Sequence, residues 1–290
     1  DVMLAVGTRF ADRVTGKVSG CASNSRIIHI DIDPTSIRKN VNVDVPVVAD
    51  CREAVIGLAD VLAAKASELN WTGAPDKWKQ TLDQYRKDHP LTYVKNGEIK
   101  PQQVIEALYK ISNGEAVITT EVGQHQMWAA QFYKYSTPRT FLSSGGLGTM
   151  GYGLPAAMGA QFARPDKLVI GIAGDGSIQM NSQEFATVVQ NKLPVKIIIL
   201  NNCYLGMVRQ WQELFYKHNY SCTCMKGQPD FVKLTEAYGA EGYRILDPDD
   251  LYGTLEKALA SPNPAVVDVK VAREENVYPM VPSGASMVEM

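Results

Sequence analysis

Short apolar runs separated by polar turns dominate the first part of the chain. Val2 to Val6 and Arg26 to Ile32 have the composition of buried strands, and Pro46 to Ala49 is a third, shorter candidate. The segment from Arg52 to Ala66 has helical periodicity, with its apolar residues on one face. This alternation predicts part of a doubly wound, parallel-sheet α/β domain over residues 1–67.

Residues 68–98 interrupt this pattern. Gly73, Pro75 and Pro90 lie around one Lys-rich segment with helical composition, Asp76 to Lys87. Because glycine and proline punctuate regular structure, we interpret this stretch as a linker.

From residue 99 to residue 290, helix and strand patterns alternate, which predicts a complete α/β domain. Leu168 to Ala173 and Val195 to Leu200 are continuous apolar runs, typical of central strands in a parallel sheet covered on both faces. Ser182 to Gln190 is a predicted helix between them, with Asn181 and Glu184 at capping-box spacing. The other predicted elements are helices at Pro101–Ile111, Leu154–Ala163, Asp230–Tyr238 and Pro248–Ala260, and strands at Ala116–Val122, Gly242–Ile245 and Ala265–Val271.

Composition narrows the class of protein. Hydrophobic residues make up 45% and charged residues 21%, the balance of an ordinary soluble globular protein, and the 29 basic and 31 acidic residues nearly cancel. This balance argues against nucleic acid or an anionic membrane as a partner, and no apolar run is long enough to span a bilayer. No segment resembles a signal peptide, and the chain begins within a strand pattern. We therefore expect a cytoplasmic protein of which this chain is a portion.

The five cysteines give no sign of a metal site. Cys222 and Cys224 are separated by one residue, which is not the spacing of zinc knuckles, and Cys21, Cys51 and Cys203 are scattered. We expect reduced structural thiols.

Oxygen-bearing side chains follow two of the predicted central strands. Asp175, within Gly174-Asp175-Gly176-Ser177, follows one strand, and Asn202 follows the next, 27 residues later. One strand–helix–strand crossover spans such a distance, so both residues are expected at the carboxyl ends of sheet strands, where α/β sheets bind ligands. A carboxylate, an amide oxygen and a nearby carbonyl, such as that of Tyr204, suit Mg²⁺ together with diphosphate oxygens. The alternative is a tight turn and an Asn-Asn loop without a ligand.

Two further motifs are ambiguous when taken alone. Residues 145–155 contain five glycines, but no Gly-Lys-Ser/Thr follows, so the segment fails as a Walker A loop and could be a plain loop-to-helix junction. Gln124 and His125 follow a predicted strand and could donate to diphosphate oxygens, although a lone histidine is more often a surface or core residue.

Together these motifs resemble the thiamine diphosphate enzymes, whose signature joins a Gly-Asp-Gly turn to an Asn-Asn pair at this kind of separation. The resemblance implies that Asp175, Asn202 and the Tyr204 carbonyl hold the metal, that Met150 wedges between the two rings of the cofactor, and that the Gly148 carbonyl accepts a hydrogen bond from its amino group. The remaining residues that it implies for cofactor binding in this domain are Val122, Gly123, Gln124, His125, Gly174, Gly176, Ser177, Leu205, Gly206 and Met207.

Within this family the sequence is most similar to the catalytic subunits of acetolactate synthases, at residues 205–212 and 7–16 and across essentially the whole chain. The resemblance implies that Trp211 shapes the pocket for the second 2-oxo acid and that Arg13 receives its carboxylate, a task suited to a guanidinium fork. Without the resemblance, Trp211 would be a core aromatic residue and Arg13 a solvated charge.

The first domain resembles the part of these enzymes that holds FAD. Asp31, in the sequence His29-Ile30-Asp31-Ile32-Asp33, follows a strand, where an acidic residue can bind a ribose hydroxyl, and the similarity continues to Asp50. The flavin of the family is structural, so no redox step is expected from it.

The reaction implied is the decarboxylative condensation of two pyruvates to 2-acetolactate, or of pyruvate with 2-oxobutyrate, in branched-chain amino-acid biosynthesis. The resemblance also implies a second large subunit, in a homodimer or tetramer, and a small regulatory subunit. No segment matches the domain that carries the family's activating glutamate, so we expect this chain alone not to turn over pyruvate. Two alternatives stay open: another thiamine diphosphate enzyme, such as glyoxylate carboligase or pyruvate oxidase, and a non-catalytic flavin-binding module.

Overall fold

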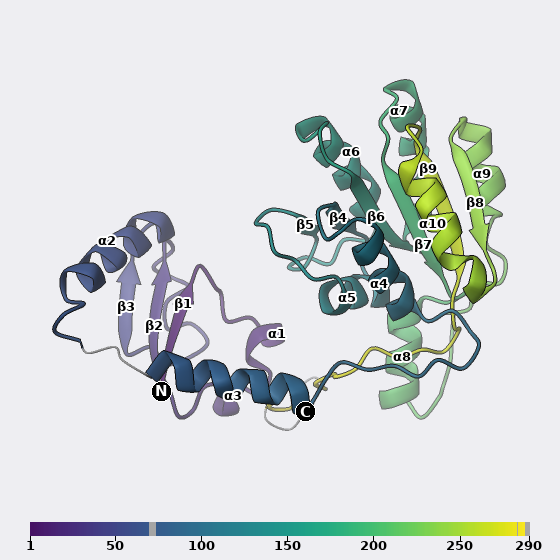
Figure 1. Ribbon diagram of the computed structural model, residues 1–290. Coiled ribbons are helices and arrows are strands. Elements are labelled where there is room, and N and C mark those ends of the chain that lie inside the picture. Colours follow the sequence, from purple (N-terminus) through teal and green to yellow (C-terminus); the bar gives the residue numbers. More distant parts are fainter. Residues whose placement is uncertain (70–73, 283, 288–290) are drawn as a thin grey trace. The chain divides into compact units, whose positions relative to one another are not determined.

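The computed structural model of the protein describes residues 1–69, 74–282 and 284–287. The chain divides into two compact units, one formed by residues 1–90 and 278–290 and the other by residues 91–277 (Figure 1). Each unit has its own parallel sheet, which confirms the predicted α/β class.

The first unit is built on a parallel sheet whose strand order, within its described residues, is β1-β2-β3. β1 (Val2–Val6) pairs with β2 (Arg26–Asp31), and β2 pairs with β3 (Val45–Val48). The helices are α1 (Asp12–Thr15), the 3-10 turn η1 (Val18–Gly20), α2 (Cys51–Ala64) and α3 (Ala74–Asp88). The carboxylate of Asp50 starts α2, because it accepts hydrogen bonds from the backbone N–H groups of Arg52 and Glu53.

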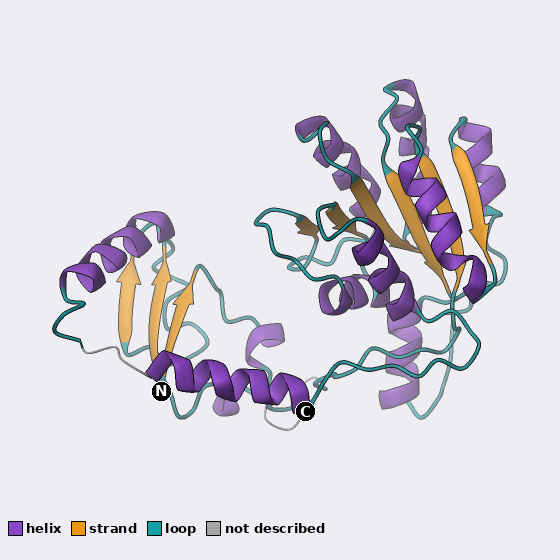
Figure 2. Ribbon diagram, in the orientation of Figure 1, coloured by secondary structure: helices purple, strands orange, loops and turns teal. Residues whose placement is uncertain are grey.

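The second unit, described throughout residues 91–277, has a six-stranded parallel sheet in the order β5-β4-β6-β7-β9-β8. Its strands are β4 (Val117–Thr120), β5 (Phe141–Ser143), β6 (Val169–Gly174), β7 (Lys196–Asn201), β8 (Glu241–Ile245) and β9 (Ala265–Lys270). Its helical segments are α4 (Pro101–Ile111), α5 (Gln124–Phe132), α6 (Gly153–Ala163), η2 (Ile178–Met180), η3 (Ser182–Glu184), α7 (Phe185–Gln190), α8 (Gly206–Phe215), α9 (Phe231–Tyr238), η4 (Pro248–Asp250) and α10 (Leu251–Ala260). Figure 2 shows helices on both faces of this sheet.

Two apolar cores hold these layers together, and adjacent strand residues alternate between them. Ile170 and Ile198 pack with α4, α5 and α10 on one face, whereas Val169 and Ile197 pack with α6, α7 and α9 on the other. Both faces of the central strands are therefore buried, which explains why β6 and β7 are continuous apolar runs in the sequence.

The boundary between the two units differs from the sequence prediction of a linker at 68–98 and a second domain at 99–290. α3 occupies much of the expected linker and belongs to the first unit, together with residues 278–290. Residues 70–73, 283 and 288–290 of these predicted segments lie outside the described residues.

Small residues explain why the end of the chain joins the first unit. The backbone N–H of Lys17 donates to the carbonyl of Ala285 at 2.9 Å, and Ser286 is buried. A Cβ at Gly16 would lie 2.5 Å from the Ala285 carbonyl oxygen, and one at Gly20 would lie 2.6 Å from the Ser286 hydroxyl. Only glycine permits this close approach of the two segments.

One predicted local detail is wrong. The Asn181 side chain accepts from the Gln183 side chain at 3.2 Å but caps no backbone N–H of the helical segment that it precedes, so it is not part of a capping box. Its amide nitrogen donates instead to the carbonyl of Gly151 at 2.6 Å. The asparagine therefore supports the glycine-rich loop.

Among the described helices, none is long and apolar enough to cross a membrane. All five cysteines lie in the described part of the chain and are free thiols there.

Candidate functional site

Three loops meet where neighbouring strands of the second unit end. β4 and β7 flank β6 on its two sides, so Val122, Asp175 and Asn202 follow three adjacent strands at their carboxyl ends. After β4 the chain adds β5 on one side of it, and then β6 and β7 on its other side, so the strand order reverses between β4 and β6. Such a switch point is where open α/β sheets bind ligands. The convergence predicted for Asp175 and Asn202 is confirmed.

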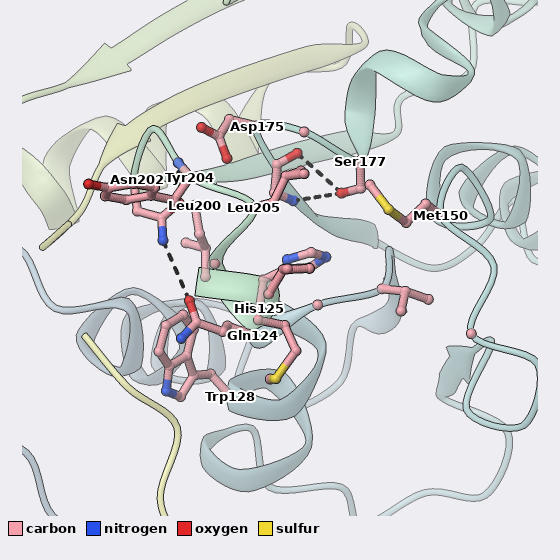
Figure 3. A pocket seen from close by; sticks show the side chains of 18 of the residues that line it. Gln124, His125, Trp128, Met150, Asp175, Ser177, Leu200, Asn202, Tyr204 and Leu205 are labelled. Atoms are coloured by element: carbon pink, nitrogen blue, oxygen red, sulfur yellow. Dashed lines mark hydrogen bonds between the residues drawn. The ribbon is translucent and has the colours of Figure 1, made fainter. Parts of the chain in front are cut away.

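These loops surround a cavity of about 230 Å³. Every site residue predicted for this unit lines it: Val122, Gly123, Gln124, His125, Gly148, Met150, Gly174, Asp175, Gly176, Ser177, Asn202, Tyr204, Leu205, Gly206, Met207 and Trp211. The sequence prediction missed Trp128, Leu200 and Val208, which line the cavity as well. Figure 3 shows Asp175, Asn202 and Tyr204 at one end of this pocket and Met150 toward the other.

The amino ends of two helices face the pocket. α5 begins at Gln124 and α8 at Gly206, and among the described residues no side chain caps either helix. The first backbone N–H groups of a helix have no partner within it, and the helix dipole adds partial positive charge there. The arrangement therefore fits an anionic group such as a diphosphate.

Asp175 is the acidic group of this pocket. Its side chain is almost fully buried, and burial raises its pKa to about 7, against the opposing effects of nearby backbone N–H groups and the positive charge of Lys270. The described residues hold no group of three or more His, Cys, Asp or Glu side chains that could bind a metal. A cation here would need Asp175, neutral oxygens and oxygens of the ligand, which is how Mg²⁺ is held beside phosphates.

Asn202 and Tyr204 supply the neutral oxygens. The Asn202 side-chain oxygen accepts the backbone N–H of Tyr204 at 3.1 Å, and its amide nitrogen faces the Gln124 oxygen at 3.5 Å (Figure 3). An amide oxygen has a second lone pair, so this bond leaves Asn202 able to bind a cation.

His125 is a neutral, enclosed side chain at the pocket wall. Burial lowers its pKa to about 3, and a hydrogen bond to the backbone of Glu121 acts in the opposite direction. Its Nε2 has no hydrogen-bond partner in the described part of the chain. Because buried polar atoms are normally paired, this nitrogen marks a place where a ligand would complete the hydrogen bonding.

The Gln124 side chain donates its hydrogen bonds within the protein and not, as predicted, toward a diphosphate. Its amide nitrogen donates to the Gln210 oxygen at 2.8 Å and to the Glu275 carbonyl at 2.9 Å. Both N–H bonds are therefore used within the fold, and donation by this side chain to a diphosphate oxygen does not fit the structure. The backbone at Gln124 still opens α5 toward the pocket.

A buried carboxylate that the sequence reasoning missed supports the glycine-rich loop. Glu121 accepts the backbone N–H of Gly151 at 2.6 Å and that of Leu154 at 3.1 Å. Burial raises its pKa, while these and neighbouring backbone N–H groups lower it. The sequence did contain a signal for this role: Glu121 follows an apolar strand, and a buried carboxylate at such a position needs hydrogen-bond donors around it.

The other predicted residues belong to the first unit. Arg13 lies on α1 with an exposed side chain, and Asp31 ends β2. The Asp31 carboxylate accepts the backbone N–H of Asp33 at 2.9 Å, and Asp50 caps α2. Their roles in substrate and flavin binding stay predictions.

Comparison with known protein families identifies both units. The family model described as "Thiamine pyrophosphate enzyme, C-terminal TPP binding domain" matches residues 121–269, which include all three strand-end loops. This chain belongs to the thiamine pyrophosphate enzymes. The model of the "central domain" of the same family matches residues 1–58, in the first unit.

Relatives of this thiamine pyrophosphate enzyme are similar along the whole chain. It is 46% identical over 298 residues to acetolactate synthase 1, chloroplastic, of Nicotiana tabacum, and covers 44% of that protein. It is 45% identical over 294 residues to the acetolactate synthase isozyme 3 large subunit of Escherichia coli K12 and covers 51% of it. An acetolactate synthase of Mycobacterium leprae is 46% identical over 297 residues, with 47% of its length covered. The chain thus spans about half the length of the curated relatives that it matches.

Proposed function

We propose that this chain supplies the cofactor-binding part of an acetolactate synthase. The reaction is the decarboxylative condensation of two pyruvates to 2-acetolactate, or of pyruvate with 2-oxobutyrate to 2-aceto-2-hydroxybutyrate, in branched-chain amino-acid biosynthesis. The observation that carries the proposal is the convergence of Asp175, Asn202 and the amino ends of α5 and α8 on one pocket. The acetolactate synthases similar to the chain over all its residues support the choice of reaction.

In this proposal the diphosphate end of thiamine diphosphate lies against the amino ends of α5 and α8. Asp175, Asn202 and the carbonyl of Tyr204 hold Mg²⁺, which neutralises the phosphate charge. The donor set fits, because it consists of one carboxylate and neutral oxygens at a pocket with unpaired backbone donors. When bound, the cofactor supplies the electron sink for decarboxylation, and the protein supplies orientation and electrostatics.

Met150 and Gly148 hold the ring end. Met150 lines the pocket on the loop that Glu121 supports, and its flexible thioether side chain suits contact with aromatic rings. Gly148 adopts a left-handed φ of 73°, and its N–H donates to the Ser144 carbonyl. We infer that its own carbonyl would accept from the amino group of the cofactor, so that the loop would hold the ring end in place.

Trp211 and Arg13 recognise the second oxo acid. Trp211 lies on α8 and lines the pocket, where its large apolar side chain shapes the space for the acceptor acid and can contact the extra methylene of 2-oxobutyrate. A guanidinium such as that of Arg13 binds a carboxylate through two parallel hydrogen bonds. Because both acceptor acids carry a carboxylate, the preference for 2-oxobutyrate over a second pyruvate is assigned to Trp211.

The first unit holds FAD in a structural role. Its parallel strands end at Val6, Asp31 and Val48, and the carboxyl ends of such strands are where dinucleotides bind. One carboxylate oxygen of Asp31 is used by Asp33, and the other, which lies 3.9 Å from His29 Nε2, is the one proposed for a ribose hydroxyl. Asp50 contributes through the position of α2.

A second large subunit is the proposed partner, in a homodimer or tetramer, with a small regulatory subunit. α8 supports this, because it buries Arg209 and Gln210 while its apolar side chains Val208, Leu214 and Phe215 are exposed. Exposed apolar side chains along one helix indicate an interaction face. The Escherichia coli relative is itself named a large subunit.

Product analysis with the protein at its full natural length tests the reaction. With pyruvate, Mg²⁺ and thiamine diphosphate, the expected product is 2-acetolactate. With added 2-oxobutyrate, we expect Trp211→Leu to lower the ratio of 2-aceto-2-hydroxybutyrate to 2-acetolactate, and Trp78→Leu, at an exposed tryptophan of α3, to leave it unchanged. Formation of acetyl phosphate, or no condensation product, would refute the proposed reaction.

A further inference from the structure

The two side chains that are proposed to bind Mg²⁺ can each present different atoms to a cation. The Asn202 side chain can turn an oxygen or an NH₂ group toward it, and only the oxygen binds metal. The Asp175 carboxylate has two oxygens, which can point in different directions. Something in the fold must therefore decide which atoms face the pocket.

Gln228 takes up one oxygen of Asp175. In the amide orientation that satisfies Asp175 and Lys270, the Gln228 nitrogen donates to Asp175 Oδ2 at 2.7 Å; in the opposite orientation it donates to Asn201 Oδ1 at 2.8 Å. In the first orientation the Gln228 oxygen accepts from Lys270 Nζ at 3.0 Å. An ammonium group can only donate, so Lys270 fixes the direction of the amide and turns its nitrogen toward Asp175.

Gln124 takes up the nitrogen of Asn202 in the same way. The Gln124 nitrogen faces the Glu275 carbonyl, which can only accept, so its oxygen faces the Asn202 nitrogen at 3.5 Å. Gln210, which is fully buried, adds a second constraint. Its oxygen accepts from the Gln124 nitrogen and from the backbone N–H of Val277, and its nitrogen donates to the Val277 carbonyl.

The hydrogen bonds around Gln228 and Gln124 follow the same arrangement. In each, a group of fixed polarity, the Lys270 ammonium or the backbone at 275–277, orients a glutamine, and the glutamine occupies one atom of a ligand side chain. The atoms that the two glutamines leave for a cation are Oδ1 of Asp175 and Oδ1 of Asn202. The Tyr204 N–H on Asn202 Oδ1 agrees with this orientation.

We propose that Gln228 and Gln124 are positioning residues that fix which oxygens of Asp175 and Asn202 face the Mg²⁺ of the proposed diphosphate site; this inference rests on the proposed function. Neither glutamine touches the cation. Partners of metal ligands that act in this way commonly change metal affinity by about 10- to 100-fold when they are removed.

The test uses Mn²⁺ as the probe, with thiamine diphosphate at a fixed saturating concentration and the purified chain. Gln228→Met and Gln124→Met keep the length of the side chain and remove its hydrogen bonds. Gln161→Met is the matched control, because Gln161 is a buried glutamine of α6 whose nitrogen donates to backbone carbonyls, away from the pocket. Thermal unfolding shows whether each variant is folded.

Electron paramagnetic resonance gives both the Mn²⁺ dissociation constant and the line shape of the bound ion. We expect the dissociation constant to rise at least ~10-fold in Gln228→Met and Gln124→Met, with an altered spectrum of the bound ion, and to stay unchanged in Gln161→Met. A purely structural role would lower the unfolding temperature without changing that spectrum.

Two other outcomes separate the two proposals. If the wild-type chain binds Mn²⁺ with thiamine diphosphate and both pocket variants match it within twofold and in line shape, the inference about the glutamines is overturned and the proposed function stands. If the wild-type chain binds no Mn²⁺ in the presence of thiamine diphosphate, both fall together.

Discussion

Replacing Glu121 by glutamine tests whether one buried carboxylate holds the glycine-rich loop in place. Each carboxylate oxygen accepts a backbone N–H, from Gly151 at 2.6 Å and from Leu154 at 3.1 Å. Glutamine has the same shape but only one oxygen. Its NH₂ group would face one of these N–H groups, donor against donor, inside the fold.

The magnitude follows from the bonds lost. One buried N–H loses its partner, which costs about 1–3 kcal/mol, and the other keeps only a neutral acceptor in place of a charged one, which costs about 1 kcal/mol more. We therefore expect Glu121→Gln to lower the free energy of unfolding by about 2–4 kcal/mol. Because the loop carries Gly148 and Met150, the affinity for thiamine diphosphate should fall as well.

Urea denaturation measures the first effect, and calorimetric titration with thiamine diphosphate and Mg²⁺ measures the second. Glu115→Gln is the control, because Glu115 is exposed just before β4 and should tolerate the change within about 0.5 kcal/mol. If Glu121→Gln were as stable as this control and bound the cofactor equally well, the carboxylate would not be holding the loop.

Two further changes probe other buried charges. Arg209 is buried on α8 and donates to Glu213, Asn276 and the Glu274 carbonyl, so Arg209→Met should lower the free energy of unfolding, measured in urea, by about 2–4 kcal/mol. This range is below that of a fully buried ion pair, because Glu213 is partly exposed. Lys217→Met, at an exposed lysine, is the control and should not lower it, so equal stability of the two variants would contradict the prediction. Burial lowers the pKa of Lys196 from 10.5 to about 8, so between these pH values the unfolded chain binds a proton that the folded chain does not, and the free energy of unfolding should rise with pH. In urea unfolding at pH 7.5 and 9.5, the increase in this free energy should be smaller in Lys196→Met than in the wild type. Equal increases would show that Lys196 is not its source.

Much of the fold could be predicted because the sheet of the second unit is buried on both faces. Burial on both sides demands continuous apolar runs, and β6 and β7 follow such runs to within one residue. α5, β5 and α8 were not predicted. β5 is three residues long, and α8 has an unusual pattern, since it buries Arg209 and Gln210 and exposes apolar residues. Periodicity alone does not tell which face of such a helix is inside.

The sequence predicted which residues line the pocket, but less well which hydrogen bonds their side chains make. The prediction that Asp175 and Asn202 lie close together was correct, because each follows a strand and neighbouring parallel strands end at the same edge of the sheet. The use of Gln124 within the fold depends on Gln210 and Glu275, which are distant in sequence. Hydrogen bonds of this kind arise from tertiary packing and leave no local signal. The same holds for Asn181, whose partner Gly151 lies 30 residues earlier.

The most direct measurement is the Mg²⁺ dependence of thiamine diphosphate binding by calorimetry, in the wild-type chain and in Asp175→Ala. Asp166→Ala is the control, because Asp166 is an exposed aspartate of the same unit that pairs with Arg164. We predict that Mg²⁺ strengthens binding in the wild type and the control and has no effect in Asp175→Ala. Mg²⁺-dependent binding by Asp175→Ala with wild-type affinity would contradict the account.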